Sequence, residues 1–184
     1  MFKKKIFSIV LAIFIVVLFN SMALASTIAL TSAGQSPDAM MVKVILKKMN
    51  VEADFDMALK PDAIKDHKAL IIVVGGSSKG LGAAGIDQDQ EKTRVEKILS
   101  IAKDRGLKVL VMHVGGDSRR GILTDTFLEI TAPQADRIIY VTGANNDGYF
   151  TKIAEEKKIP VEESESIQSL DIPLKKVLGE WGVI

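Results

Sequence analysis

The stretch Ala69-Leu70-Ile71-Ile72-Val73-Val74 is followed directly by Gly75-Gly76-Ser77-Ser78-Lys79-Gly80. Its six apolar residues are continuous rather than alternating, which is typical of a strand buried on both faces. The same order, an apolar run and then a glycine-rich polar segment, recurs after Val109–Met112 and after Ile138–Val141. Between these runs, apolar residues recur at the spacing of a helix face, as at Val95, Ile98, Leu99 and Ala102. Buried strands that alternate with helices predict a parallel sheet covered by helices on both faces.

The rest of the chain extends this alternation. Thr27–Thr31 is a candidate first strand, and Pro37–Met49 is a candidate helix that begins at Ser36-Pro37. One face of that helix is expected to carry Met41, Val42, Ile45, Leu46 and Met49. The remaining expected elements are a strand at 51–55, a short helix at 61–64, helices at 122–130 and 149–158, and a last helix after Pro173. We therefore predict an α/β fold: a three-layer, doubly wound, mostly parallel sheet of five strands, or six with Val161, that is flavodoxin-like.

The first 25 residues have the pattern of an export signal. Lys3, Lys4 and Lys5 precede an apolar run at 6–19, and the small-residue site Ala23-Leu24-Ala25 follows. This run of 14 residues is short for a bilayer-spanning helix, which needs about 20, so cleavage is favoured over an uncleaved membrane anchor. We expect a signal peptide at 1–25 and a single α/β domain at 26–184, exported and, after cleavage, without a membrane partner.

Composition excludes several classes of protein. Without the three lysines of the signal, the chain has 21 basic and 23 acidic residues, a formal charge of −2, so nucleic acid is not an expected partner. There is no cysteine, which rules out disulfides, thiol catalysis and cysteine-bound metal. The sequence gives no indication of an oligomeric state.

Polar, glycine-rich segments follow four of the expected strands. Their residues are 31–36, 75–80, 115–121 and 142–148, whereas the connections at the opposite ends of the strands look like plain turns. In a parallel sheet the carboxyl edge is where ligands bind, at the switch in strand order. We therefore expect a binding or catalytic site at this edge. The predicted ligand-binding residues are Gln35, Ser36, Ser77, Ser78, Lys79, Asp117, Arg119, Arg120, Asn145, Asn146 and Asp147.

The charges in these segments favour a small polar or anionic ligand. Arg119, Arg120 and Lys79 supply cations, and arginine can hold a carboxylate or phosphate through two hydrogen bonds. Asp117 and Asp147 suit a ligand that also carries hydroxyl groups. Because loop neighbours seldom both point inward, only one of the two arginines is expected to reach the ligand. In the strand order 2-1-3-4-5, the first and third strands are neighbours, so their loops would form the walls of the crevice.

Three segments together carry a family resemblance. They are Gly34-Gln35-Ser36-Pro37-Asp38-Ala39, the glycine-rich segment from Gly75 to Asp87, and Asn146-Asp147-Gly148-Tyr149-Phe150-Thr151-Lys152. The chain resembles a family of small exported bacterial proteins known only as a domain of unknown function, over residues from about Thr27 to Val177. The resemblance implies export and a single domain, and it implies no activity.

Two enzymatic alternatives remain open. Gly76–Gly82 is similar to the cofactor loop of short-chain dehydrogenases, but it follows the third expected strand and that family's tyrosine and lysine pair is missing, so we predict no cofactor. Gly116-Asp117-Ser118 resembles the nucleophile block of an esterase family, whose mechanism needs a histidine base. The chain has only His67 and His113, and His113 could serve Ser36 or Ser77 across the edge.

A metal site is not predicted. Asp87, Asp89 and Glu91 are spaced like the opening of a calcium loop, but Lys92 stands where that loop needs glycine. Acidic residues in the first turn of a helix offset its dipole, which explains them without a metal.

The favoured interpretation of the sequence is a ligand-binding protein. A serine hydrolase is the alternative, a nucleotide-cofactor oxidoreductase is a weaker one, and a scaffold or partner-binding module is a third class.

Overall fold

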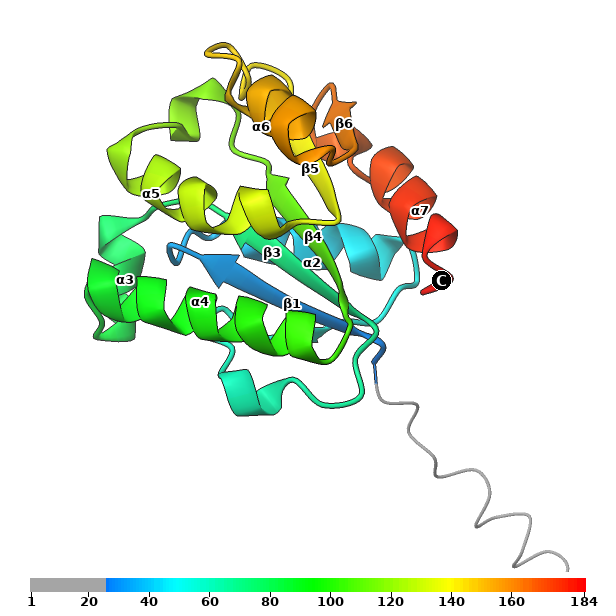
Figure 1. Cartoon of the computed structure of the whole chain (residues 1–184), viewed down its shortest axis with the longest axis horizontal. Helices are drawn as coiled ribbons and strands as arrows, with labels where there is room; N and C mark the ends of the chain where they lie inside the picture. Colours follow the sequence, from blue (N-terminus) through cyan, green and yellow to red (C-terminus); the bar gives the residue numbers. More distant parts are fainter. Residues whose placement is uncertain (1–25) are drawn as a thin grey trace, which may run out of the picture.

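The computed structural model describes residues 26–184, and the expected signal peptide at 1–25 lies outside the described residues. Six strands form one parallel sheet in the order β2-β1-β3-β4-β5-β6 (Figure 1). Their bounds are β1 (Ile28–Ala33), β2 (Asp54–Phe55), β3 (Ala69–Val74), β4 (Lys108–His113), β5 (Arg137–Val141) and β6 (Val161–Ser164). The predicted doubly wound α/β fold is confirmed, with the sixth strand at Val161.

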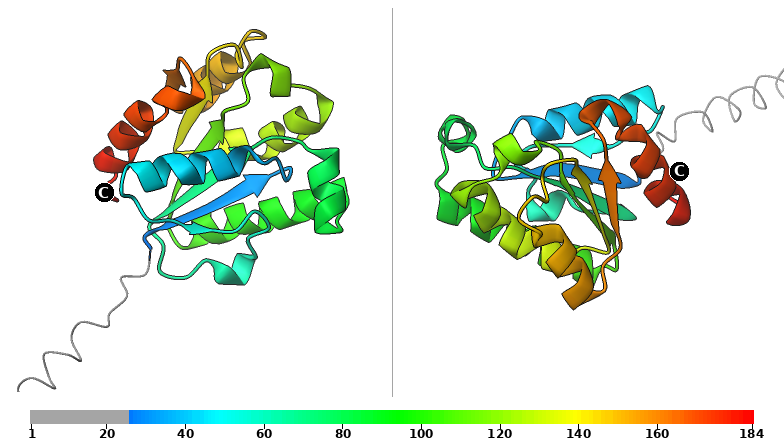
Figure 2. Two further views of the ribbon diagram at one scale, coloured as in Figure 1. Left: turned by 180° about the vertical axis from the view of Figure 1, so that it is seen from behind. Right: turned by 90° about the horizontal axis from the view of Figure 1, so that it is seen from above.

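Helices cover both faces of the sheet. The α-helices are α2 (Asp38–Lys48), α3 (Ser78–Ala84), α4 (Gln88–Asp104), α5 (Ile122–Thr131), α6 (Tyr149–Lys157) and α7 (Asp171–Glu180). The 3₁₀ helices are η1 (Pro61–Ala63), η2 (Asp117–Arg119), η3 (Ala132–Gln134) and η4 (Ile167–Ser169). Side chains of α4, α5 and α6 share one apolar core, and those of α2 and α7 share the other, so the two views of Figure 2 show three layers. None of the helices within residues 26–184 is long and apolar enough to cross a membrane.

β1 and β3 lie in the interior of the sheet, and every residue of both strands is buried. β1 pairs with β3 over six residues, from Ile28 with Ala69 to Ala33 with Val74. The prediction that these two strands are neighbours is therefore confirmed. Their following helices, α2 and α4, pack on opposite faces of the sheet, which makes the β1–β3 junction the switch in strand order.

Three local expectations were wrong. β1 continues to Ala33 because it pairs with β3 along its whole length, so its polar loop is shorter than expected. Ser78-Lys79-Gly80 begins the short helix α3 rather than lying in a loop, since the Ser77 side chain caps that helix by accepting from the Gly80 amide. Met41 was placed on the buried face of α2, but it is 42% exposed because that helix packs through Ala39, Val42, Ile45 and Leu46.

A buried ion pair ties the first loop to α4. Glu91 is fully buried, and its Oε2 accepts a hydrogen bond of 2.7 Å from Nε of Arg94. Oε1 of Glu91 accepts from the Gly34 amide at 2.9 Å and from Gln35 Nε2 at 3.0 Å. Arg94 also donates to the Ser32 carbonyl at 2.6 Å, so one side-chain pair joins the end of β1 to α4.

We expect Glu91→Ala to destabilise the protein by about 3–5 kcal/mol, because it leaves the Arg94 charge and two loop donors without their buried acceptor. Chemical denaturation at neutral pH measures this change. Glu96→Ala is the matched control, since Glu96 is an exposed residue of the same helix, and it should change stability by no more than about 0.5 kcal/mol. Equal effects of the two substitutions would contradict the role given to Glu91.

Candidate functional site

The first and third loops close on each other at the carboxyl edge. Gln35 forms an isolated antiparallel bridge with Gly76, and the Ser77 amide donates to the Gly34 carbonyl at 2.8 Å. A Cβ on Gly80 would collide with the Gln35 carbonyl oxygen, so the glycine there allows α3 to pack against the first loop. Gly80 of the dehydrogenase-like motif is therefore explained by this close approach of two backbone segments, without a bound phosphate.

Gln35 and Ser36, which we predicted as ligand contacts, are both buried and engaged by the protein. The side chain of Gln35 donates to the Met57 carbonyl as well as to Glu91, each at 3.0 Å. Ser36 is 1% exposed, and its Oγ accepts from the Asp38 amide at 3.3 Å, as in a helix cap. The two loops are thus neighbours, as expected, and these side chains lie inside the junction between them.

His113 at the end of β4 is buried between backbone carbonyls. Its Nδ1 lies 3.0 Å from the Val74 oxygen and its Nε2 lies 3.1 Å from the Gly116 oxygen. A neutral imidazole can donate only one of these two hydrogen bonds. Ser118 Oγ, in turn, donates to the Gly115 carbonyl at 3.3 Å. These contacts give His113 no serine hydroxyl within hydrogen-bond distance among the described residues.

Arg120 joins the loop after β4 to the loop after β5. Its guanidinium donates to Asp125 at 2.8 Å, to Asp147 at 2.7 and 3.1 Å, and to the Ala144 carbonyl at 2.6 Å. Burial lowers the pKa of Arg120, but the hydrogen bonds that it donates to the two carboxylates, together with their negative charges, outweigh this effect and raise the pKa overall. Arg120 also stands 5.3 Å from the ring centre of Tyr149, so it is a structural link between the two loops.

The three polar residues after β5 mostly hold α6 and the neighbouring loop. Asn145 Oδ1 accepts from the Phe150 amide at 2.8 Å, and Asn146 Nδ2 donates to Asp117 at 3.3 Å. Hydrogen bonds from Arg120 are the main cause that lowers the pKa of Asp147. The hydroxyl of Tyr149 is buried, and this burial, with the Glu129 carboxylate, raises its pKa to about 12, so the phenol is neutral.

Arg119 and Lys79 are the predicted cations that remain accessible. Both are exposed, and neither has an acidic partner within 4.0 Å among the described residues, in contrast to Arg120. Ser78, beside Lys79 in the first turn of α3, is exposed as well. The stem of Arg119 lies so close to Gly115 that a Cβ there would collide with it. The expectation that only one of two adjacent arginines faces a ligand therefore points to Arg119.

Asp38 is a candidate residue that we did not predict. It is 4% exposed, and its Oδ2 is buried without a hydrogen-bond partner in the described chain. A Cβ on Gly75 would lie 3.1 Å from this oxygen, and one on Gly115 would lie 3.3 Å from it. The carboxylate thus stands between the ends of β3 and β4, beside the stem of Arg119.

The sequence did contain a signal for Asp38. It lies in the Ser36-Pro37-Asp38 helix start, where an acidic residue is explained by the helix dipole alone. A carboxylate that serves only the dipole is expected to be solvated. Only the packing of α2 on the sheet brings Asp38 beneath the glycines of two other strands, so its burial could not be read from the helix signal.

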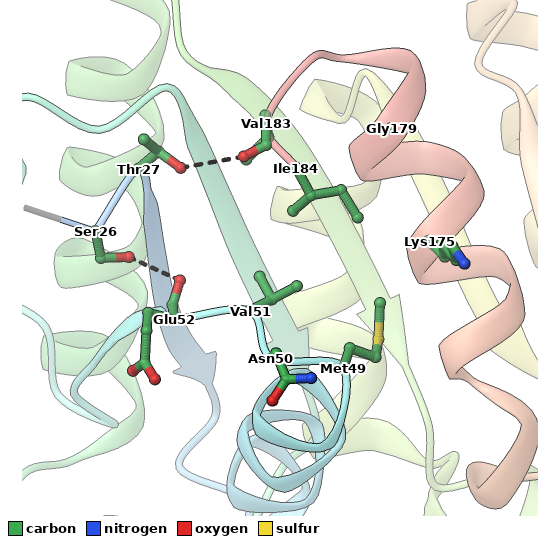
Figure 3. Close-up of a pocket in the computed structure, with 10 residues that line it drawn as sticks. All are labelled: Ser26, Thr27, Met49, Asn50, Val51, Glu52, Lys175, Gly179, Val183 and Ile184. Carbon is green, nitrogen blue, oxygen red and sulfur yellow. Dashed lines mark hydrogen bonds between the residues drawn. The ribbon is translucent and has the colours of Figure 1, made fainter. Parts of the chain in front are cut away.

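Four cavities within the described residues are lined by none of the predicted ligand-binding residues. The largest, about 660 Å³, is at the opposite end of β1, where the first strand, the end of α2 and the end of α7 meet (Figure 3). Ser26 donates there to the Glu52 carbonyl at 2.9 Å, and Thr27 to the Val183 carbonyl. A smaller cavity beside it includes His67, whose Nε2 lies 3.0 Å from Asp54. His67 is therefore remote from the serines of the carboxyl edge.

Comparison with known proteins gives a family and no activity. A family model described as "Domain of unknown function (DUF6305)" matches residues 25–178. The chain belongs to this family. A search of curated proteins finds no match. The resemblance to a family of unknown function, drawn from Gly34–Ala39 and two other segments, is thus confirmed.

Among solved structures, the chain is similar to the esterase AlinE4 of the SGNH-hydrolase family and to point mutants of it. The identity is 11–12%, the alignments cover 87% of this chain and 96% of the esterase, and the TM-scores are 0.30–0.32. A similarity at this level carries no argument about the activity of the DUF6305 chain.

The Arg120–Asp147 pair predicts a specific acid sensitivity. Because the pKa of Asp147 is lowered in the folded state, its contribution is complete above the ordinary carboxyl value of 3.8 and is lost as pH falls through the lowered value. We therefore expect Asp147→Asn to be less stable than wild type at pH 7, with a difference that shrinks below about pH 4.

Thermal unfolding across the acid range measures this difference. Glu155→Gln is the matched control on α6, since Glu155 is exposed and has no ion pair among the described residues. A stability difference for Asp147→Asn that stays constant with pH would argue against the assigned ion pair.

Proposed function

We propose that the protein is exported and binds a small polar molecule at the carboxyl edge of the sheet. In this proposal Arg119, with Lys79, contacts an anionic group of the ligand, and Asp38 accepts a hydrogen bond from a hydroxyl or ammonium group of the same molecule. Export rests on the pattern of residues 1–25, and N-terminal sequencing of the processed protein should begin at Ser26.

The observation that carries the proposal is the unpartnered carboxylate of Asp38. Buried polar groups in folded proteins nearly always have hydrogen-bond partners, and a buried carboxylate without one costs free energy. The position of Asp38 at the carboxyl edge of a parallel sheet is the position where doubly wound folds receive ligands. A donor group of a bound ligand would supply the partner that the described chain lacks.

The neighbouring cation supports a ligand of mixed polarity. Arg119 has its aliphatic stem packed on Gly115, and its guanidinium has no acidic partner within residues 26–184, whereas Arg120 beside it is held by two carboxylates. Arginine binds carboxylate or phosphate groups in a planar, two-point arrangement. A cation above a carboxylate favours a molecule with an anionic end and a donor, such as a hydroxy acid, an amino acid or a sugar phosphate.

The contacts of His113 and Ser36 favour ligand binding over hydrolysis as the function of this edge. A serine nucleophile needs a base within hydrogen-bond distance, and both ring nitrogens of His113 face backbone carbonyls instead. Ser36 is buried with its hydroxyl engaged by the Asp38 amide. We therefore propose no catalytic role for these residues.

Binding of a defined probe tests the role of Arg119. A thermal-shift screen with phosphate, malate, aspartate and glucose 6-phosphate selects the probe, and calorimetry then measures its affinity. Arg119→Ala should weaken binding about tenfold or more, because a charge-assisted hydrogen bond contributes about 1.5–3 kcal/mol. Lys157→Ala, an exposed lysine near the opposite edge, is the control and should leave affinity unchanged. If Arg119→Ala and Lys79→Ala each change affinity by less than about threefold, the anion site is refuted.

Asp38→Asn separates a ligand-binding role from a structural one. The amide keeps the shape of the side chain but removes a buried charge without a partner, so we expect a higher melting temperature without ligand. The same substitution should weaken binding of the selected probe. A variant that is less stable and binds normally would show that Asp38 serves the fold alone.

A further inference from the structure

One face of the molecule carries most of its exposed large apolar side chains. Of the six such residues in the described chain, four lie on α2 and at the start of α7, and the other two are Ile122 and Ile184. The four are Met40, Met41, Val44 and Ile172, with exposed fractions of 45, 42, 49 and 70%. We call these four residues the α2–α7 patch. Exposed apolar groups that gather on one face are typical of interaction surfaces.

The patch borders a hollow between the two helices. A cavity of about 480 Å³ lies there, and Figure 2 shows α2 and α7 side by side on the same face of the sheet. Met41, Val44 and Lys48 line it from α2, while Ile167, Gln168 and Asp171 line it from η4 and the first residue of α7. Ile172 follows Asp171 directly and is largely exposed, so a protrusion and a hollow of similar chemistry are adjacent on one face.

The charges of the hollow are also complementary to each other. Lys48 lies on the α2 wall and Asp171 on the opposite wall, and neither has an ion-pair partner within 4.0 Å among the described residues. A surface that carries an apolar protrusion, an apolar hollow, a free cation and a free anion is complementary to a copy of itself. In a two-fold pair every such contact forms twice, which is the basis of isologous interfaces.

We propose that two copies of this chain associate through the α2–α7 patch, as a two-fold dimer in which Ile172 of each copy enters the hollow beside Val44 of the other. Asp171 of one copy then pairs with Lys48 of the second. The interface covers the outer face of α2 and leaves the carboxyl-edge loops of α3 and η2 outside it. This proposal is independent of the ligand proposed above.

The test is the oligomeric state of protein purified from cells that express the full chain. Light scattering after gel filtration, and sedimentation equilibrium from micromolar to near-millimolar concentration, should give twice the mass of the processed chain. Ile172→Asp and Val44→Asp should each produce a folded monomer. Ile122→Asp is the matched control, because Ile122 is 91% exposed at the start of α5, on the other face of the sheet, and it should leave the dimer intact.

A charge exchange identifies the pairing within the interface. Lys48→Glu and Asp171→Lys alone each place like charges together twice per dimer, so each should raise the dimer dissociation constant about five- to thirtyfold. The double variant should restore it to within about threefold of wild type. At concentrations where all variants are monomeric, each charge reversal should lower the melting temperature slightly, because Lys48 ends α2 and Asp171 begins α7, where their native charges offset the helix dipoles. These small losses should add in the double variant rather than cancel, which separates a contact between two copies from one within a single chain.

Several results would overturn the proposal. A wild-type protein that is monomeric at every concentration would do so, including one that instead sediments with anionic phosphatidylglycerol vesicles, which would assign the patch to a membrane surface. A dimer that survives Ile172→Asp, or one that dissociates equally with Ile122→Asp, would place the interface elsewhere. If Val44→Asp fails to fold, Ile172→Asp decides the outcome alone, since its side chain is largely solvent-exposed.

Discussion

The buried pair of Glu91 and Arg94 holds the switch in strand order together. Its two side chains take up the Gly34 amide, the Gln35 side chain and the Ser32 carbonyl, which are polar groups at the end of β1 that the sheet itself leaves unsatisfied. An ion pair that loses water must be fully hydrogen-bonded to be tolerated. Because these partners lie at the end of β1 and the pair itself lies on α4, the ion pair holds the end of β1 against a helix of the opposite layer from α2.

That constraint shapes the whole carboxyl edge. With the first loop drawn toward α4, Gln35 lies against Gly76 and there is no room for a side chain at Gly80. The junction where a doubly wound fold would often open a crevice is therefore packed. The candidate polar groups lie one strand further along the sheet, at the ends of β3 and β4, where the buried Asp38 stands beside the stem of the exposed Arg119.

Two adjacent arginines have different roles because their side chains point in different directions. Arg120 donates hydrogen bonds to Asp125, Asp147 and the Ala144 carbonyl, and these contacts hold the two loops together. Arg119 precedes it in the same turn, and its side chain leaves in another direction, over Gly115. A pair of identical residues thus supplies one structural link and one exposed cation.

The fold class, and the edge of the sheet at which polar residues gather, can both be read from the order of residues along the chain. Continuous apolar runs at Ala69–Val74 and its counterparts predict buried parallel strands, because only a sheet covered on both faces hides every side chain of a strand. The loops after those strands then share one edge by geometry alone, and β1 beside β3 follows from the common strand order of such folds.

Which side chains at that edge are exposed or left without a partner among the described residues depends on how the elements pack, and the sequence pattern does not show it. Asp38 and Met41 have clear helical positions in the sequence, yet the first is buried and the second is exposed, because their environment depends on how α2 is rotated against the sheet. Arg120 differs from Arg119 because it pairs with Asp125 and Asp147, which lie 5 and 27 positions further along the chain. Periodicity describes an element's own faces, whereas burial and pairing depend on what the other elements bring against them.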